Sequence, residues 1–294
     1  MNGDMLSPQI AGKRPIAVMV ENYPDARPQS GLADADIVYE TLAEGGITRF
    51  LAFYQTRGVP NIGPVRSART YFADIANEWN AVYAHVGGNS DVLANIRAGD
   101  YKNISDADQF FNGDYFHRVS QRPAPHNMYT STSKLDELAE ARGFGMEAAY
   151  QPWLFKDDAP MATPTDSIEI NFSFPDYAVN YRYDASRNAY VRWMAGKPHT
   201  DLDTGKQIIA KTVLVQLVKI YPVQSDTPLS IGMDLASGGK GYVFEDGKVT
   251  VGAWKKIGGR TRFYNANGAE ISFNRGQIWV ELVPDDGVRR ISWK

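Results

Sequence analysis

The first half of the chain alternates short apolar runs with polar connections, and this alternation limits the possible folds strongly. Residues 15–20, 37–39, 50–54 and 81–86 are largely apolar runs of strand length. Runs this short, without regular polar positions, are typical of strands that are buried on both faces of a sheet. Helical spacing appears between some of them, so we expect a mixed α/β unit.

Helices can be placed in this half from apolar spacing and from capping residues. In the first of them, apolar residues recur at the interval of one helix face: Phe72, Ile75, Ala76 and Trp79. Ser67 is the expected N-cap of this helix, and Ser90 is the expected cap of a short helix that follows Gly87-Gly88. A further helix is predicted over residues 134–142, after the hydroxyl-rich stretch 130–133.

The second half changes to a pattern of strands and turns. Residues 178–183 and 189–194 flank a polar turn and predict a hairpin, and residues 212–220 form a long β-branched run. Asp246-Gly247 and Asn267-Gly268 are strong turn dipeptides between alternating segments. This half should therefore be nearly all β.

These patterns predict two domains. The fold class is α/β, with a mixed α/β layered sandwich domain at residues 13–155, which carries a polar cleft. The polar, proline-containing stretch 156–166 is the expected linker. A smaller, mostly antiparallel β domain is expected at residues 167–294.

Composition excludes several kinds of site. The chain of 294 residues contains no cysteine, which excludes disulfides, zinc–thiolate sites and thiol catalysis. Its net charge of −3 gives no overall electrostatic case for nucleic acid. No apolar run approaches the roughly 20 residues of a membrane span. The first five residues have neither a basic start nor an apolar core, so we expect no signal peptide in this chain and a longer natural precursor.

Four polar connections in the first half repeat one design, in which Arg, His, Glu or Asn stands beside Gly, Pro or Ser. They are Glu44-Gly45-Gly46-Ile47-Thr48-Arg49, Gly63-Pro64-Val65-Arg66-Ser67-Ala68-Arg69, His85-Val86-Gly87-Gly88-Asn89-Ser90 and Arg122-Pro123-Ala124-Pro125-His126-Asn127. Connections held by a rigid scaffold are where binding and catalytic groups concentrate. We therefore expect these four to form the polar cleft.

Arg66 and Arg69 bracket the predicted start of a helix, three residues apart. A helix N-terminus already carries partial positive charge, so two cations there call for a compensating anion. A bound carboxylate or phosphate would supply it, because helix N-termini and guanidinium groups both suit anions. An internal ion pair with Glu40 or Glu44 would supply it equally well, and the sequence leaves both interpretations open.

The predicted ligand-binding set follows from these connections. Arginines would neutralise the ligand, and histidine, asparagine and serine side chains would orient it: Arg49, Arg66, Arg69, His85, Asn89, Ser90, His126 and Asn127. Either His85 or His126 could also carry a proton near neutral pH. We expect Arg66, Arg69, His85 and His126 to line one cavity, whereas His117, beside Tyr115-Phe116, is expected to pack or to lie at a rim.

No catalytic residue is assigned from the sequence. Glu44 and His126 are the candidates for general acid/base chemistry, and a hydrolytic pair would need a second carboxylate such as Glu40 or Asp91. The chain has no Gly-x-Ser-x-Gly elbow, and the glycines after His85 lack the spacing or the lysine of known nucleotide-binding loops. Residues 199–205 lack the ligands of a calcium loop and predict a solvated turn. We expect neither a metal nor a cofactor.

The motifs resemble those of the YerB-like family of bacterial lipoproteins of unknown function. The four connections above carry the resemblance, together with the following segments: Arg14-Pro15-Ile16-Ala17-Val18-Met19-Val20-Glu21-Asn22, Pro198-His199-Thr200-Asp201, Gly238-Gly239-Lys240-Gly241 and Trp279-Val280-Glu281-Leu282-Val283-Pro284. It implies an α/β sandwich, a smaller β domain and attachment to the outer face of the cytoplasmic membrane. It supplies no catalytic residues. The signal peptide and the lipid-bearing cysteine of the family pattern are not in this chain.

These observations lead to one expected function and two alternatives. The expected function is an extracytoplasmic binding protein whose cleft holds an anionic small molecule or envelope polymer. The first alternative is a hydrolase of a cell-envelope polymer with Glu44 or His126 as general acid/base, and the second is a scaffold that docks a protein partner through the β domain. No nucleic-acid partner is expected, and contact with the membrane is expected only through a lipid anchor that this chain lacks.

Overall fold

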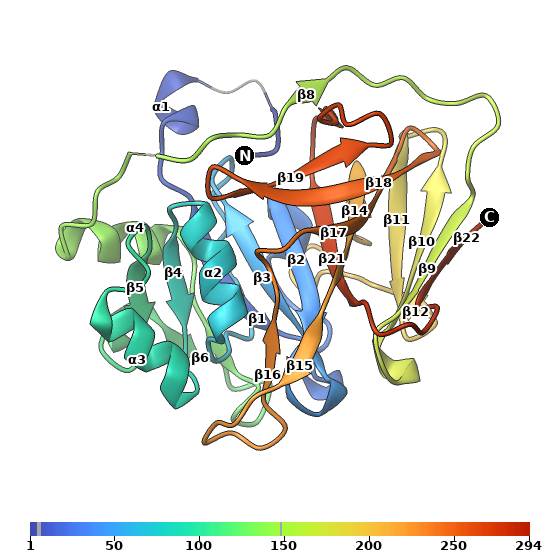
Figure 1. The fold of residues 1–294 in the computed structure, drawn as a ribbon. Helices are drawn as coiled ribbons and strands as arrows, with labels where there is room; N and C mark the ends of the chain where they lie inside the picture. Colours follow the sequence, from blue (N-terminus) through green and yellow to red (C-terminus); the bar gives the residue numbers. More distant parts are fainter. Residues whose placement is uncertain (5–6, 148) are drawn as a thin grey trace.

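A ten-stranded sheet runs through both halves of the chain in the computed structural model, which describes residues 1–4, 7–147 and 149–294 (Figure 1). The strand order is β19-β18-β17-β14-β21-β2-β3-β1-β4-β5, and a second sheet has the path β12-β11-β10-β9-β22 with β13 paired to β11. The fold is thus mixed and rich in strands. In the described part of the chain, no helix is long and apolar enough to cross a membrane.

The elements of the first half are α1 (Pro8–Ala11), β1 (Ile16–Glu21), η1 (Pro24–Ala26), η2 (Leu32–Asp34), β2 (Ile37–Leu42), η3 (Glu44–Gly46), β3 (Thr48–Tyr54), α2 (Thr70–Glu78), β4 (Val82–His85), α3 (Ser90–Ala98), β5 (Ser105–Asp108), η4 (Gly113–Tyr115), β6 (His117–Arg118), β7 (Met128–Tyr129), α4 (Thr132–Ala141) and β8 (Phe155–Lys156). Those of the second half are β9 (Ser167–Asn171), η5 (Pro175–Tyr177), β10 (Ala178–Asp184), β11 (Ala189–Met194), β12 (Lys197–Pro198), β13 (Ile209–Ala210), β14 (Thr212–Val218), β15 (Ile220–Pro222), β16 (Ile231–Met233), β17 (Gly239–Glu245), β18 (Lys248–Ile257), β19 (Arg260–Asn265), β20 (Phe273–Asn274), β21 (Ile278–Pro284) and β22 (Ile291–Trp293).

Strand β1 explains why the predicted strands read as continuous apolar runs. Ile16, Val18 and Val20 face a core that also contains residues of α4 and of the second sheet. Ala17 and Met19 face the opposite core, which contains the buried side of α2. Both faces of the large sheet are therefore covered, and every residue of β1 is buried.

The helices occur where they were predicted, but two of their predicted caps are wrong. The apolar face of α2 is buried as expected, with Phe72, Ile75, Ala76 and Trp79 at most 3% exposed. Its N-cap is Arg69 rather than Ser67, and α3 has Asn89 at the N-cap rather than Ser90; neither cap residue makes a side-chain hydrogen bond to its helix. Helix α4 is capped as the hydroxyl-rich stretch suggested, since the Ser131 side chain accepts a hydrogen bond from Lys134 N.

The second half contains strands and one short 3₁₀ turn in the described residues. The predicted hairpin is confirmed, because β10 and β11 pair antiparallel from Val179↔Met194 to Asp184↔Ala189. Lys156, the first residue of the predicted linker, lies in β8, which pairs with β20. The rest of the predicted linker contains no helix or strand.

The two halves share the large sheet, which the sequence patterns did not anticipate. Strand β21 of the second half pairs in parallel with β2 of the first, from Ile37↔Ile278 to Thr41↔Leu282. Strand β14 continues the sheet on the other side of β21, again in parallel. Strands from both predicted domains therefore lie in one continuous sheet.

A buried charged cluster joins the large sheet to the second sheet. Arg192 of β11 is fully buried and donates to Glu40 of β2, and its guanidinium lies 3.8 Å from Glu281 Oε1. The same guanidinium stacks over the Trp279 ring at 4.2 Å and donates to the hydroxyl of Tyr181 at 2.9 Å. A buried charge of this kind is tolerated because its partners are charged and hydrogen-bonded.

Glu281 carries the second carboxylate of this cluster. Burial raises the pKa of Glu281 well above its ordinary value of 4.5, and the negative charge of Glu40 raises it further. The Tyr181 hydroxyl contacts Glu281 Oε1, and Oε2 is buried without a hydrogen-bond partner in the part of the chain that the structure describes. Protonated Glu281 is neutral, so the charge of Arg192 is then balanced by the carboxylate of Glu40 alone.

We predict that Glu281→Gln changes how stability depends on pH. Above pH 4.5, the ordinary pKa, the unfolded chain releases the proton of this carboxyl, whereas the folded chain keeps it. The free energy of unfolding of wild type therefore falls as the pH rises above 4.5. Glutamine is neutral at every pH. Relative to wild type, the free energy of unfolding of the variant should therefore increase by at least about 1 kcal/mol between pH 5 and 8.

Urea unfolding at several pH values measures this difference. Glu169→Gln is the matched control, because Glu169 is exposed on β9. Parallel pH profiles for wild type and Glu281→Gln would contradict the assignment of a raised pKa to Glu281.

Candidate functional site

The predicted binding residues gather at one edge of the large sheet. Strands β1, β4 and β5 are parallel neighbours, and they end there at Glu21, His85 and Asp108. Strand β3 runs the other way and places Arg49 opposite Glu21. Open α/β sheets bind ligands at the carboxyl ends of their parallel strands. The edge is therefore the position at which a ligand site is expected.

Glu21 joins two of the predicted residues. Its Oε1 lies 3.1 Å from Arg66 Nε, and its Oε2 lies 3.0 Å from His126 Nδ1. The His126 ring stacks on Tyr23, with the ring centroids 5.5 Å apart. Glu21 is nearly buried, whereas the side chain of Arg66 is 28% exposed. Arg66 and His126 therefore lie at the same point of the edge, and Arg66 reaches solvent.

Glu44 joins the other two arginines. Arg69 Nε donates to Glu44 Oε1, and Arg49 Nη2 lies 3.6 Å from Glu44 Oε2. The side chains of Arg49 and Arg69 are less than a tenth exposed. For Arg69, the internal ion pair with Glu44 is thus present. Glu40, the other carboxylate considered, pairs instead with Arg192.

Glu44 is poorly placed to act as a general acid. Burial alone would raise its pKa, but the hydrogen bond from Arg69 and the charges of Arg49 and Arg69 together lower it. A carboxylate that two arginines keep ionised has no proton to donate near neutral pH. Its lowered pKa also makes it a weak base. The other candidate, His126, contacts Glu21 rather than Glu44.

His85 lies at the edge, but it does not face an open cleft. The residue is fully buried, with Nδ1 2.8 Å from the Gly87 carbonyl oxygen and Nε2 2.8 Å from Asp106 Oδ1. Both ring nitrogens are thereby occupied. The side chain holds the turn that follows β4, and the role of His85 in orienting a ligand stays a prediction.

Asn89 and Ser90 contact the second half of the chain. Asn89 Nδ2 donates to Ser225 Oγ at 3.3 Å, and Ser90 N donates to Asp226 Oδ1 at 3.2 Å. Ser225 and Asp226 belong to the loop between β15 and β16. The hydrogen bond from Ser90 lowers the pKa of the Asp226 carboxyl. A carboxylate of the protein itself therefore occupies the start of α3, where Asn89 and Ser90 were expected to orient a ligand.

Asn127 and His117 lie on the β6–β7 hairpin. Asn127 Oδ1 accepts from Arg118 at 2.6 Å, and Nδ2 donates to the Val119 carbonyl oxygen at 3.1 Å. Asn127 thus supports its own hairpin and not a ligand. His117 is exposed, with its ring 6.3 Å from that of Tyr129, in keeping with a position at a rim.

The region 199–205 forms a turn, as predicted. Asp201 Oδ1 accepts from the backbone N of Asp203 and of Thr204 at 3.1 and 3.2 Å. His199 is buried and bonded to Arg192 and Gln29, and burial lowers its pKa well below the ordinary value. Within residues 1–4, 7–147 and 149–294, no three His, Asp or Glu side chains are grouped to hold a metal ion.

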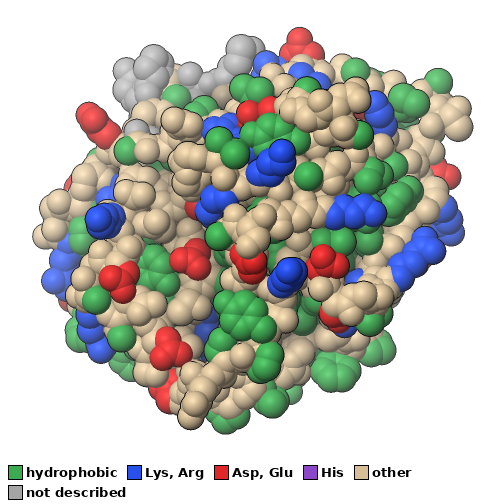
Figure 2. All heavy atoms as spheres, viewed as in Figure 1, with side chains coloured by type: hydrophobic (Ala, Val, Ile, Leu, Met, Phe, Trp, Pro, Cys, Tyr) green, Lys and Arg blue, Asp and Glu red, His purple; other side chains and the backbone are tan. Residues whose placement is uncertain are grey.

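Among the arginine ion pairs at the edge, cations outnumber carboxylates, whereas Asp106 and Asp108 lie beside His85 at the same edge. Three guanidinium groups, those of Arg49, Arg66 and Arg69, face two carboxylates, those of Glu21 and Glu44. Burial and the positive charge of Arg69 lower the pKa of Arg49 to about 10. On the face shown in Figure 2, basic and acidic side chains are interspersed.

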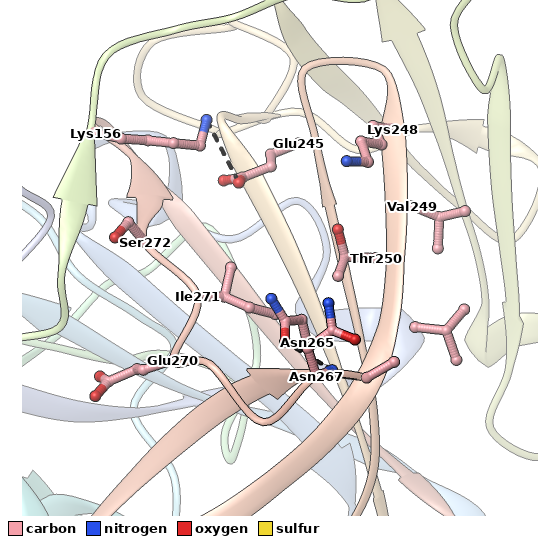
Figure 3. A pocket seen from close by; sticks show the side chains of 12 residues that line it. Lys156, Glu245, Lys248, Val249, Thr250, Asn265, Asn267, Glu270, Ile271 and Ser272 are labelled. Atoms are coloured by element: carbon pink, nitrogen blue, oxygen red, sulfur yellow. Dashed lines mark hydrogen bonds and ion pairs between the residues drawn. The ribbon is translucent and has the colours of Figure 1, made fainter.

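Two cavities differ in their relation to this edge. One, of about 620 Å³, borders it and is lined by Ser67, Gly87, Gly88 and Asp108 among others. Within the described residues, its lining does not include the predicted arginines or histidines themselves. The other, of about 520 Å³, lies on strands β17–β19 at the opposite end of the sheet. Its lining contains two lysines and two glutamates, and Lys156 lies 3.5 Å from Glu245 (Figure 3).

Sequence reasoning missed the acidic half of the site. Three carboxylates contact predicted site residues but were not themselves proposed. Glu21 contacts Arg66 and His126, and Asp106 and Asp108 contact His85. Glu21 follows the apolar run 15–20 directly, and this position at a strand end could have identified it. The short, polar strand β5 carries no such signal for the two aspartates.

We predict that Arg69 and Arg66 differ in their contribution to stability. Arg69→Gln removes a nearly buried, charge-assisted hydrogen bond to Glu44 and should lower the free energy of unfolding by about 1.5–3 kcal/mol. Arg66→Gln should cost less than about 1 kcal/mol, because Arg66 is partly exposed and its Nε makes no hydrogen bond. Urea unfolding at pH 7 measures both values, and an equal or larger cost for Arg66→Gln would show that this description of the two groups is wrong.

Comparisons with known proteins place the chain in a family. Residues 2–145 match the family described as "Protein of unknown function (DUF3048) N-terminal domain", and residues 168–280 match its C-terminal domain. The chain is 36% identical over 289 residues to "Putative lipoprotein YerB" of Bacillus subtilis, covering 97% of this chain and 85% of that protein.

A solved structure shows the same fold. The crystal structure of the YerB protein from Bacillus subtilis matches with a TM-score of 0.89 at 32% identity, covering 100% of this chain and 98% of that one. The resemblance drawn from the sequence motifs is therefore confirmed. This chain belongs to the YerB-like family, whose two domains carry the DUF3048 description of unknown function.

Proposed function

We propose that this chain is a binding protein on the outer face of a bacterial membrane. Its ligand is an anionic small molecule or an anionic part of a cell-envelope polymer, and its site is the edge of the large sheet where β1, β4 and β5 end. Arg66 is the residue that contacts the anion. Arg49 and Arg69 contribute positive potential from beneath it.

The observation that carries this proposal is that three arginines share two carboxylates, and that Arg66 is the most exposed of the three. Glu44 is shared by Arg49 and Arg69, and Glu21 is shared by Arg66 and His126. Arg66 Nε is buried and has no hydrogen-bond partner among the described residues. An anion at this point would pair with the part of the Arg66 guanidinium group that reaches solvent, whose planar donors suit it.

The proposed location rests on the relatives. The Bacillus subtilis relative carries the word lipoprotein in its name, and the chain covers 85% of it. By the proposal, the natural precursor of this chain carries a lipid anchor, and the binding edge then faces the cell envelope.

Binding is better supported than hydrolysis. Glu44 is committed to two arginines and has a lowered pKa, and His126 belongs to a different ion-pair group. General acid/base hydrolysis needs two proton-handling groups directed at one substrate atom. No particular observation favours the scaffold alternative, in which the second half docks a protein partner.

We predict that phosphate and sulfate stabilise the protein through Arg66. An anion that binds only the folded state raises the melting temperature, and the rise grows with the logarithm of 1 + L/Kd, where L is the anion concentration. In thermal-shift measurements at constant ionic strength, both anions should raise the melting temperature of wild type above that in chloride. Arg66→Gln should remove this increase, because a charge-assisted contact is worth about 1.5–3 kcal/mol and its loss weakens binding about 10- to 100-fold.

Arg57→Gln provides the control for this experiment. Arg57 is an exposed arginine of the same half that pairs with Asp34 at 3.4 Å, so its loss should leave the anion effect intact. The proposal would be refuted if wild type showed no shift, or if Arg66→Gln kept the full shift.

We further predict association with anionic wall polymers without their cleavage. Purified wall fragments incubated with the protein should co-sediment with it and show no released fragments by chromatography. Turnover that disappears in Glu44→Gln or His126→Ala would reverse this conclusion in favour of the hydrolase.

A further inference from the structure

Two adjacent phenylalanines are exposed beside the cavity that borders the arginine edge. Phe110 and Phe111 are 71% and 64% exposed, although phenylalanine is normally among the most buried residues. Both line the cavity of about 620 Å³, which lies between the turn after β5, the loop after β4 and helix α3. Exposed aromatic side chains at the wall of a cavity are suited to contact a ligand.

The backbone beneath these rings is firmly held. Asp108 Oδ1 accepts from Phe110 N at 3.2 Å and from Gly87 N at 2.9 Å. Phe111 N donates to the Asp108 carbonyl oxygen at 3.1 Å, and the Phe111 carbonyl oxygen accepts from Arg142 at 2.9 Å. The two rings are therefore presented to solvent by a fixed turn.

Gly87 allows the Phe110 ring to lie against the loop after β4. Its φ of +57° favours glycine, and a Cβ atom there would lie 2.9 Å from Phe110 Cε2. His85 fixes the same loop, because its Nδ1 contacts the Gly87 carbonyl oxygen. Buried His85 thus acts as a positioning residue for the cavity wall.

The cavity also presents polar groups and adjoins the arginine edge. Ser67 lines it, follows Arg66 in the chain and accepts a hydrogen bond from Arg49 through its carbonyl oxygen at 2.7 Å. Within the described residues, the hydrogen bonds to the Asp108 carboxylate all use Oδ1, which leaves Oδ2 for another donor. Arg97 of α3 supplies a positive charge to the lining.

We propose that this cavity binds the sugar ring of an acidic or phosphorylated sugar whose charged group contacts Arg66. The proposal rests on the anion-binding function proposed above and specifies its ligand class. The C–H groups on one face of the pyranose ring pack on Phe110 and Phe111. The hydroxyl groups of the sugar reach Asp108 and Ser67. The aromatic wall matches the apolar face of such a ligand, and the carboxylate of Asp108 accepts hydrogen bonds from its hydroxyl groups. The adjoining cation matches its negative charge.

The test compares two ligands that share a phosphate group. Glucose 6-phosphate has the sugar ring, whereas glycerol 3-phosphate has hydroxyl groups but no ring. By isothermal titration calorimetry, wild type should bind glucose 6-phosphate about tenfold more tightly than glycerol 3-phosphate. Phe110→Ser/Phe111→Ser should lose this advantage and keep its affinity for glycerol 3-phosphate, and Arg66→Gln should weaken the binding of both.

Val288→Ser is the control variant, because Val288 is 60% exposed and lies outside the cavity. Equal affinity of wild type for the two ligands, or an advantage that persists in the double phenylalanine variant, would overturn the ring site and leave the anion-binding function intact. Wild type that binds neither phosphate ester would instead refute the anion-binding function. Self-association of wild type that is abolished in the double variant would assign the two rings to an interface between copies of this chain.

Discussion

Strands β2 and β21 run parallel, and Glu40 and Glu281, opposite each other in this pairing, both meet Arg192 from the second sheet. The pairing joins residues that are far apart in the chain and makes one sheet of the two halves. The fully buried arginine then connects the second sheet to it. Removing one partner of a buried pair of this kind is costly, so the packing of the second sheet on the large sheet depends on this contact.

The proposed binding edge depends on the shared sheet in two ways. Strands β1 and β3 are held between β2 on one side and β4 on the other, so the pairing of β2 fixes where Glu21 and Arg49 end up. The loop between β15 and β16, which belongs to the second half, also contacts the start of α3 through Asp226. Both halves of the chain therefore contribute to the surroundings of the site.

Local features of the fold could be predicted from the sequence, whereas long-range features could not. The buried strand at 15–20 and the β10–β11 hairpin have local patterns, and the structure has both. The pairing of β2 with β21 has no local signal, because parallel strands can be joined across any distance in the chain. The same limit applies to the site: its edge was located from four polar connections, but which carboxylate pairs with which arginine depends on strand register. His85 shows this clearly, since its pattern suited a ligand contact and its two ring nitrogens serve the turn after β4.

Native-state hydrogen exchange tests the shared sheet directly. The account predicts that the most protected amides of β2 and β3 and those of β14 and β21 exchange with the same free energy of opening, equal to that of global unfolding. Their dependence on denaturant should coincide as well. If β14 and β21 opened in a separate step while β1–β3 remained protected, the two halves would be independent units, and the account would be contradicted.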